Sequence, residues 1–205
     1  MERATRDQEL ALPSRRGLLL GAAALAAAPA ALLTASRADA QAQAVDYPSA
    51  ESLPASTSNY TVSSRPSSYP VNYVVIHVTQ ETWADAVAIF RNPAKKVSAH
   101  YVVRSADGHI GQCVREKDIA WHAGNWDYNT RSIGIEHEGW VDKPEYFTNA
   151  LYERSAALTA AICTKYGIPR DREHIIGHVQ VPGTDHTDPG PYWDWSRYIR
   201  MVNFA

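Results

Sequence analysis

Residues 73–78 read YVVIHV, and four of these six residues are valine or isoleucine. A continuous run of this kind is typical of a strand that is buried on both faces in the middle of a sheet. His77 stands near the end of the run, where the backbone of a central strand would hold its ring in a well-defined place. We therefore expect residues 73–78 to form the central strand of the fold and to present His77 at its end.

The rest of the chain alternates between strand and helix patterns around this strand. Further strands are predicted at residues 100–104 and 110–114 (a hairpin that turns at Asp107-Gly108), 119–122, 132–138 and 175–176. Helices are predicted after the N-cap Thr82 as far as Asn92-Pro93, from Tyr146 to Tyr166 with Gly167 closing the helix, and from Tyr192 to Asn203. This alternation predicts a single domain of the α/β or α+β class, with a central mixed sheet flanked by helices.

The first forty residues have the order of features expected of an export signal. The pair Arg15-Arg16 is followed by an Ala-rich uncharged run to Ser36 and by Ala38-Asp39-Ala40, which matches an A-x-A cleavage site. The order resembles a twin-arginine export signal over residues 1–40. The alternative is an uncleaved membrane anchor, although alanines and a proline make the run only weakly apolar. We expect an exported protein, periplasmic or extracellular, with no integral membrane span after the signal is removed.

Residues 41–69 are rich in Ser, Ala, Pro and Thr and predict a linker or an extended N-terminal arm, which Tyr47, Leu53, Tyr60 and Val62 would pin to the domain. Residues 70–205 then form the domain itself. Cleavage after residue 40 leaves 165 residues (205 − 40), enough for one domain with a sizeable core.

The charge balance and the cysteines exclude several classes of protein. Removal of five Arg and four acidic residues leaves a balance of 15 − 18 = −3, and no basic patch suggests nucleic acid. We expect a monomer. Cys113 and Cys163 lack metal-ligand neighbours at zinc spacing. They could pair in an exported protein, but the apolar surroundings of Cys163 favour two buried thiols.

A rigid loop near the C-terminus concentrates side chains that bind metals. Residues 177–195 read GHVQVPGTDHTDPGPYWDW, with two histidines and three aspartates among prolines and glycines. His178 follows a short predicted strand, and Asp188 lies ten positions later (188 − 178), beyond a bend at Pro182-Gly183. A catalytic zinc site needs three protein ligands and one open position. His77, His178 and Asp188 are candidates, although a lone histidine at the end of a strand is more often a hydrogen-bonded core residue.

Five blocks of sequence together resemble a known family. They are VIHVT at 75–79, SAHY at 98–101, WHAG at 121–124, SIGIEHEG at 132–139, and GH at 177–178 with TDPGPYWDW at 187–195. In this order they resemble the zinc-dependent N-acetylmuramoyl-L-alanine amidases of the amidase-2 type, which are related to peptidoglycan recognition proteins and to phage lysozyme-type amidases. The resemblance spans roughly residues 70–200.

The resemblance implies a zinc amidase with a fold like that of the recognition proteins. Zinc would be held by His77, His178 and Asp188, and Glu136 would move the proton of the attacking water to the leaving L-alanine amine. Glu138 shares a face with Glu136 in a regular strand and is the alternative base. Several members carry a lysine two residues before the aspartate ligand, where this chain has His186. His186 would then stabilise the oxyanion.

The substrate would be peptidoglycan or its muropeptides. His100 and His122 lie in family blocks, where lining of the cleft and a hydrogen-bonded core role are equally open. The loop AGNWDYNTRS, with Asn125, Trp126 and Arg131, would grip sugar rings and stem-peptide carboxylates, unless it is simply a packed loop. Two other functions compete with the amidase: a non-catalytic peptidoglycan-binding module, and a zinc hydrolase of a different amide. The completeness of the ligand set and of Glu136 favours an enzyme.

Overall fold

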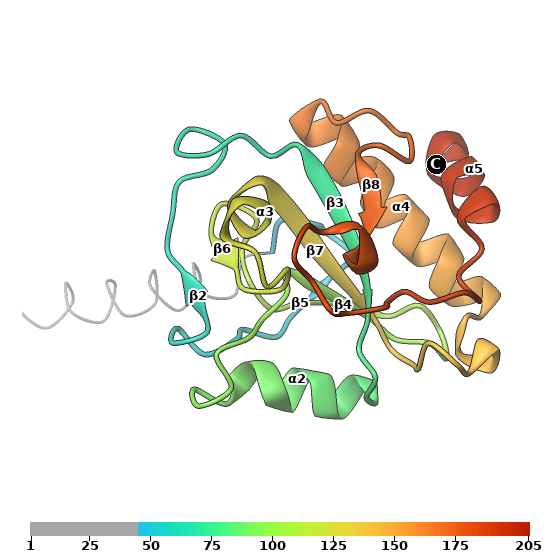
Figure 1. The fold of residues 1–205 in the computed structure, drawn as a ribbon, viewed down its shortest axis with the longest axis horizontal. Helices are drawn as coiled ribbons and strands as arrows, with labels where there is room; N and C mark the ends of the chain where they lie inside the picture. Colours follow the sequence, from blue (N-terminus) through green and yellow to red (C-terminus); the bar gives the residue numbers. More distant parts are fainter. Residues whose placement is uncertain (1–44) are drawn as a thin grey trace, which may run out of the picture. The chain divides into compact units, whose positions relative to one another are not determined.

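A six-stranded mixed sheet forms the centre of the molecule (Figure 1). The computed structural model describes residues 45–205, so the predicted export signal lies outside the described part of the chain. The strands run in the order β1-β5-β4-β7-β3-β8: β1 (Glu51–Ser52), β5 (Ile110–Gln112), β4 (Tyr101–Val103), β7 (Ser132–His137), β3 (Tyr73–Val78) and β8 (Ile175–Gly177). The pair β4–β5 is antiparallel and the other neighbours are parallel, so the predicted mixed sheet is confirmed. A separate pair joins β2 (Tyr60–Thr61) to β6 (Ile119–Ala120).

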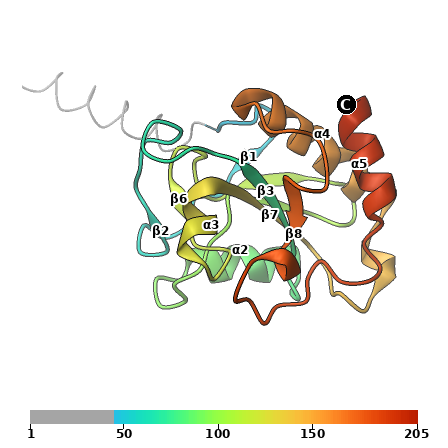
Figure 2. The same ribbon diagram turned by 45° about the horizontal axis from the view of Figure 1, so that its top comes forward.

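Helices cover both faces of this sheet (Figures 1 and 2). One face carries α4 (Asn149–Tyr166) and α5 (Trp195–Phe204), and the other face carries α2 (Trp83–Arg91). Strand residues alternate between the two sides because successive side chains point to opposite faces. Val74 and Ile76 pack into the core beneath α4, whereas Val102 packs against Phe90 of α2. Val75 and His77, which alternate with these residues, therefore face away from α4.

Most predicted elements are confirmed, with small shifts at their ends. Thr82 caps α2, and Asn92 ends it. The long helix begins after the cap Thr148, since Pro144–Tyr146 form a separate 3₁₀ turn, and it ends at Gly167 in a left-handed conformation (φ 68°). Cys113 and Cys163 are both buried free thiols, as expected. No helix within residues 45–205 combines the length and apolar character needed to cross a membrane.

One helix was not predicted. Residues 126–131, interpreted from the sequence as part of a loop, form the helix α3 (Trp126–Arg131). The side chain of Asn125 caps it by accepting a hydrogen bond from the Tyr128 amide at 3.3 Å. Six residues are too few to show the apolar periodicity by which helices are recognised in a sequence.

Residues 45–69 pack onto the rest of the described chain. Leu53 is buried, Tyr47 and Tyr60 pack partly buried against the core, but Val62 is 71% exposed and pins nothing. Asp46 of this segment is held by several polar partners: Arg115 (2.9 and 3.0 Å), the Glu116 amide (2.9 Å), Gln112 (2.6 Å) and, more distantly, Lys165 (3.6 Å). Burial raises the pKa of Asp46, but the hydrogen bonds from Arg115 and the Glu116 amide outweigh it and hold this pKa well below its usual range.

This network predicts a pH-dependent contribution of Asp46 to stability. A carboxyl whose pKa is lowered by folding stabilises the protein above its unfolded pKa of about 3.9, and the contribution is lost as the pH falls toward the folded pKa. Asp46→Asn should lower the free energy of unfolding by about 1–3 kcal/mol at neutral pH, and by less in acid. Urea unfolding at neutral pH and in acid measures the two free energies of unfolding. Asp107→Asn, in an exposed ion pair with Arg104, is the matched control and should cost at most about 1 kcal/mol. Equal losses for Asp46→Asn at both pH values would contradict the prediction.

Candidate active site

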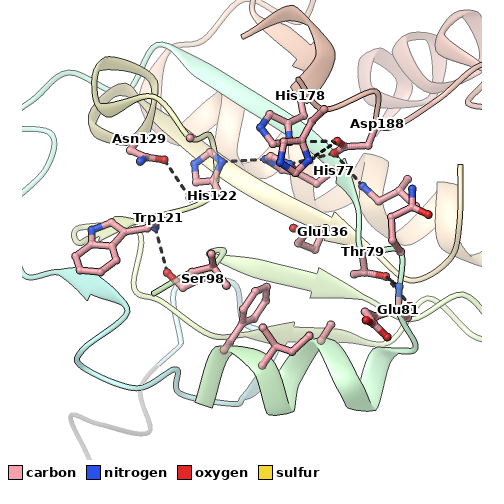
Figure 3. Close-up of a pocket in the computed structure, with 18 of the residues that line it drawn as sticks. His77, Thr79, Glu81, Ser98, Trp121, His122, Asn129, Glu136, His178 and Asp188 are labelled. Carbon is pink, nitrogen blue, oxygen red and sulfur yellow. Dashed lines mark hydrogen bonds and ion pairs between the residues drawn. The ribbon is translucent and has the colours of Figure 1, made fainter. Parts of the chain in front are cut away.

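Three neighbouring parallel strands end at one edge of the sheet and carry the first three site residues there. The pairing of β3 with β7 places His77 directly beside Glu136. The pairing of β3 with β8 places Ile76 beside Gly177, so that His178 follows at the level of His77. Because paired residues of adjacent strands point to the same face, all three side chains gather on the side of the sheet away from α4. This edge is shown in Figure 3.

The loop after β8 brings Asp188 back to the same place. The Val179 amide donates to the Asp188 carbonyl at 3.0 Å, and Pro189 packs on Gly177, where a Cβ atom would lie 2.7 Å from the proline ring. The carboxylate of Asp188 consequently lies 3.3 Å from His77 Nδ1 and 3.1 Å from His178 Nδ1. Asp188, His77 and His178 are each at most 5% exposed.

These three residues fit a metal ion of the type predicted from the sequence. One ligand atom from each of His77, His178 and Asp188 lies within 4.8 Å of the others. Two imidazoles and one carboxylate form a donor set that zinc uses in catalytic sites, with the fourth position open. Among the described residues, nothing bonds to the buried second nitrogen of His178. Burial lowers the pKa of His77, so its ring is neutral at physiological pH, as a metal ligand must be.

The side chain of Glu136 is half-buried, and one of its carboxylate oxygens lacks a donor. Its Oε2 atom is inaccessible to solvent and has no hydrogen-bond partner in the described part of the chain. Burial first, and then the negative charge of Asp188, raise the pKa of Glu136 well above its ordinary value. A carboxyl with a raised pKa beside three ligand-type residues is typical of a catalytic acid or base.

Glu138, the alternative base, is occupied elsewhere. Its two oxygens accept hydrogen bonds from the Trp83 amide at 2.9 Å and from the Ser105 amide at 2.8 Å. Glu138 thus connects the first turn of α2 with the segment after β4. It is absent from the residues that line the cavity at the site, whereas Glu136 is among them.

A cavity of about 1150 Å³ opens over the cluster of His77, His178 and Asp188. Its remaining walls come from α2, from the segment before β4, from α3 and from the loop that carries Asp188; they include Ala86, Ile89, Phe90, Lys96, Val97, Trp126 and Asp185. This volume is at the upper end of the range for ligand-binding pockets. Trp126 is 53% exposed at this wall.

His186 lies at the mouth of this cavity. Its ring stacks on His178 with the centroids 4.3 Å apart, and its Nδ1 lies 3.6 Å from Asp188. The side chain is 62% exposed, unlike those of the three cluster residues. His186 therefore lies close to the cluster, as predicted. Most of its side chain remains open to solvent.

Three residues predicted to bind substrate lie outside the cavity. His100 is fully buried; it accepts a hydrogen bond from the Gly134 amide at 3.0 Å and lies 2.6 Å from the guanidinium of Arg65. Asn125 uses its side chain to cap α3 and to donate to the Pro182 carbonyl at 3.0 Å. Arg131 pairs with Asp127 and lines a separate hollow of about 280 Å³. His100 is thus a core histidine, the second of the two roles left open by the sequence.

His122 does reach the cavity, but its ring is committed to His77. The His77 Nε2 and His122 Nδ1 atoms are 2.9 Å apart, and His122 Nε2 lies 3.1 Å from Ser132 Oγ. Asn129 supports this arrangement by accepting from the amides of His122 and Ala123, at 3.0 and 2.8 Å. Ser132 and Asn129 were not recognised from the sequence, although Ser132 opens the SIGIEHEG block.

Comparisons with known proteins show which family the chain is similar to. The family described as N-acetylmuramoyl-L-alanine amidase (Amidase_2) matches residues 67–191. The N-acetylmuramoyl-L-alanine amidase A of Achromobacter lyticus is 37% identical over 177 residues, which cover 78% of this chain and 97% of that protein. An AmpD crystal structure has a TM-score of 0.63 and 29% identity, covering 78% of this chain and 99% of that chain. A complex of Escherichia coli AmiD with the substrate anhydro-N-acetylmuramic acid-L-Ala-D-gamma-Glu-L-Lys has a TM-score of 0.55 and 26% identity, covering 64% of this chain and 57% of that chain.

Proposed function

Because the chain belongs to the Amidase_2 family of N-acetylmuramoyl-L-alanine amidases, and is accordingly a hydrolase of an amide bond, we propose that it is a zinc enzyme acting on peptidoglycan. The bond cleaved would join the lactyl group of N-acetylmuramic acid to the L-alanine of the stem peptide. The observation that carries the proposal is the juxtaposition of a three-residue ligand cluster with the Glu136 carboxylate, whose enclosed Oε2 atom has no partner among the described residues.

His77, His178 and Asp188 would hold the zinc ion. When bound, zinc acts as a Lewis acid on the scissile carbonyl and lowers the pKa of a bound water to about 7. The protein contributes rigidity. His77 and His178 lie at the ends of two adjacent strands, and the loop that carries Asp188 is hydrogen-bonded to the turn that follows His178. A site held in this way needs little reorganisation during the reaction.

Glu136 would move the proton. Its raised pKa suits a group that takes a proton from the attacking water and returns it to the leaving nitrogen of L-alanine. Its Oε2 atom is enclosed by the protein and has no partner among the described residues. A non-catalytic binding module would have no use for a carboxylate oxygen enclosed in this way, because its desolvation costs stability.

The substrate class is inferred from the cavity and from a relative. The AmiD structure contains a muropeptide, named as its substrate, in which a muramic acid carries a short peptide. The cavity here is large enough for a ligand of that size, and Trp126 offers an exposed indole to its sugar or peptide. We infer that peptidoglycan fragments bind with the lactyl amide next to His77, His178 and Asp188.

Peptidoglycan digestion tests the reaction. The protein should release free stem peptides and leave peptide-free glycan, which mass spectrometry of the products distinguishes. It should contain about one zinc ion per chain. Asp188→Ala should lose the zinc and with it the activity. Glu136→Gln should keep the zinc and the fold but lose about 10²- to 10⁴-fold in rate.

Glu138→Gln provides the matched control for Glu136→Gln. This variant should lose about 1–3 kcal/mol of unfolding free energy, because the Trp83 and Ser105 amides lose a charged acceptor. The folded fraction should retain most of the rate. Shortened stem peptides or cut glycan strands among the products would overturn the amidase assignment, and full zinc occupancy in Asp188→Ala would remove Asp188 from the ligand set.

His186 would assist the oxyanion that forms at the scissile carbonyl. Its ring sits beside His178 and Asp188 at the open side of the cluster. His186→Ala should therefore keep its zinc and lose about 10²- to 10³-fold in kcat, as for the removal of one oxyanion donor. Rates and zinc content are compared with those of His109→Ala, which removes a histidine that contacts Glu51 away from the site. A His186→Ala enzyme as fast as the wild type would make His186 an ordinary exposed loop residue.

Export would bring the enzyme to the cell wall. The twin-arginine-like segment at 1–40 and its A-x-A site support export and cleavage after Ala40. The N-terminus of the protein recovered from outside the cytoplasm should therefore begin at Gln41. Replacement of Arg15 and Arg16 by lysine should keep the uncleaved chain inside. An uncleaved chain in the membrane fraction would instead support the anchor.

A further inference from the structure

We propose that His122 and Ser132 are positioning residues that fix the tautomer of His77, so that its Nδ1 lone pair points at the metal. This inference rests on the proposed function, because it concerns how the zinc ligand is prepared. His122 contacts His77, as Figure 3 shows, and Ser132 contacts His122, so both would act on the metal site through His77.

The contacts form one unbranched chain of four groups. His77 Nε2 lies 2.9 Å from His122 Nδ1, and His122 Nε2 lies 3.1 Å from Ser132 Oγ. Ser132 Oγ in turn donates to the Tyr128 carbonyl at 2.5 Å. The other nitrogen of His77, Nδ1, faces Asp188 at 3.3 Å. The chain therefore connects the ligand atom of His77 to a backbone carbonyl of α3.

The chemistry of these groups permits one direction of donation. A carbonyl only accepts, so the single hydroxyl proton of Ser132 is given to Tyr128. Ser132 can then only accept from His122, which places the proton of a neutral His122 on Nε2 and leaves its Nδ1 as an acceptor. His77 must donate through Nε2–H, so its Nδ1 carries a lone pair. The opposite tautomer of His77 would set its Nε2 lone pair against the lone pair of His122 Nδ1.

The same direction follows from the metal end of the chain. A His77 Nδ1 that binds zinc has no proton, so its proton is on Nε2 and requires an acceptor at the position of His122 Nδ1. Without a cation, the His77 lone pair and the Asp188 carboxylate would face each other at 3.3 Å as two acceptors. The hydrogen-bond chain and the ligand cluster therefore require the same arrangement of protons.

The fold has a prepared place for the His122 ring. The ring lies directly on Gly134 of β7, where any Cβ atom would come within 2.5–2.7 Å of the ring atoms. Asn129 holds the backbone of His122 and of Ala123 through its side-chain oxygen. The glycine of the SIGIEHEG block thus has a specific purpose: it lets an imidazole stack against the strand that carries Glu136.

Zinc retention in the full-length, zinc-loaded enzyme tests this inference. Zinc affinity is measured by transfer to a chromophoric chelator for the wild type, His122→Phe, His122→Asn, Ser132→Ala and the control His174→Gln. Loss of such a partner typically weakens metal binding by about 10- to 100-fold, which is the effect expected for His122→Phe. His122→Asn places an acceptor oxygen near the former Nδ1 and should recover most of the affinity. Ser132→Ala, which frees His122 to adopt either tautomer, should show a smaller loss, and His174→Gln none.

Nitrogen-15 NMR of the His77 ring reports which of its nitrogens carries the proton. A substitution that only disturbed packing would leave this signal unchanged. The zinc-loaded wild type should show Nε2 protonated and Nδ1 bound to metal, with the Nε2 proton protected from exchange. In His122→Phe that protection should be lost. If His122→Phe fails to fold, Ser132→Ala, which removes one hydroxyl, decides the question through the His122 ring signals.

Two failures are distinguishable. A wild-type protein that holds no zinc would contradict the proposed function. A wild type that holds zinc, together with a folded His122→Phe of equal affinity and an unchanged His77 spectrum, would overturn the positioning role and leave the proposed function standing.

Discussion

The parallel pairing of β3 with β7 on one side and with β8 on the other is the constraint on which the site depends. It places Glu136, His77 and His178 at the ends of three adjacent strands, on the face of the sheet away from α4. A shift of one residue in either pairing would turn one of these side chains toward the core beneath α4. The apolar residues that alternate with them, Val74 and Ile76, prevent that shift because they are fully buried against α4. Packing on one face therefore determines chemistry on the other.

Burying the polar groups of the site costs free energy. Hydrogen bonds and ion pairs offset this cost for some of the groups but not for others. His77 has a partner on each ring nitrogen, and Asp188 lies within reach of two imidazoles. Glu136 has no donor for one of its oxygens within the described chain, and burial together with the negative charge of Asp188 raises its pKa. Stability would favour a neutral, smaller side chain at this position. A carboxylate with an uncompensated oxygen beside these residues is the arrangement in which catalysis and stability conflict.

Arg65 is a buried polar residue that does not line the cavity. Its guanidinium donates to the carbonyls of Thr130 and Ser132 at 3.0 and 2.7 Å and to that of Glu116 at 2.8 Å. These carbonyls belong to the end of α3, the start of β7 and the segment before β6. Arg65 thereby ties residues before the central strand to the segment that carries Ser132 and His122. The stretch before residue 70 contributes in this way to the shape of the site without lining it.

Local sequence was sufficient for most of the longer elements, but not for the short helix α3. The valine and isoleucine run of β3, the caps Thr82 and Gly167, and the turn at Asp107-Gly108 are short-range signals, so they could be recognised without knowledge of the fold. Only the tertiary structure separated Glu136 from Glu138, which have the same residue type and share one face of the strand. Glu136 lines the cavity, whereas the oxygens of Glu138 accept from the amides of Trp83 and Ser105. His100 likewise proved to be a core histidine that accepts from the Gly134 amide. Hydrogen-bond partners far apart in sequence leave no local pattern, and for this reason these distinctions required the folded chain.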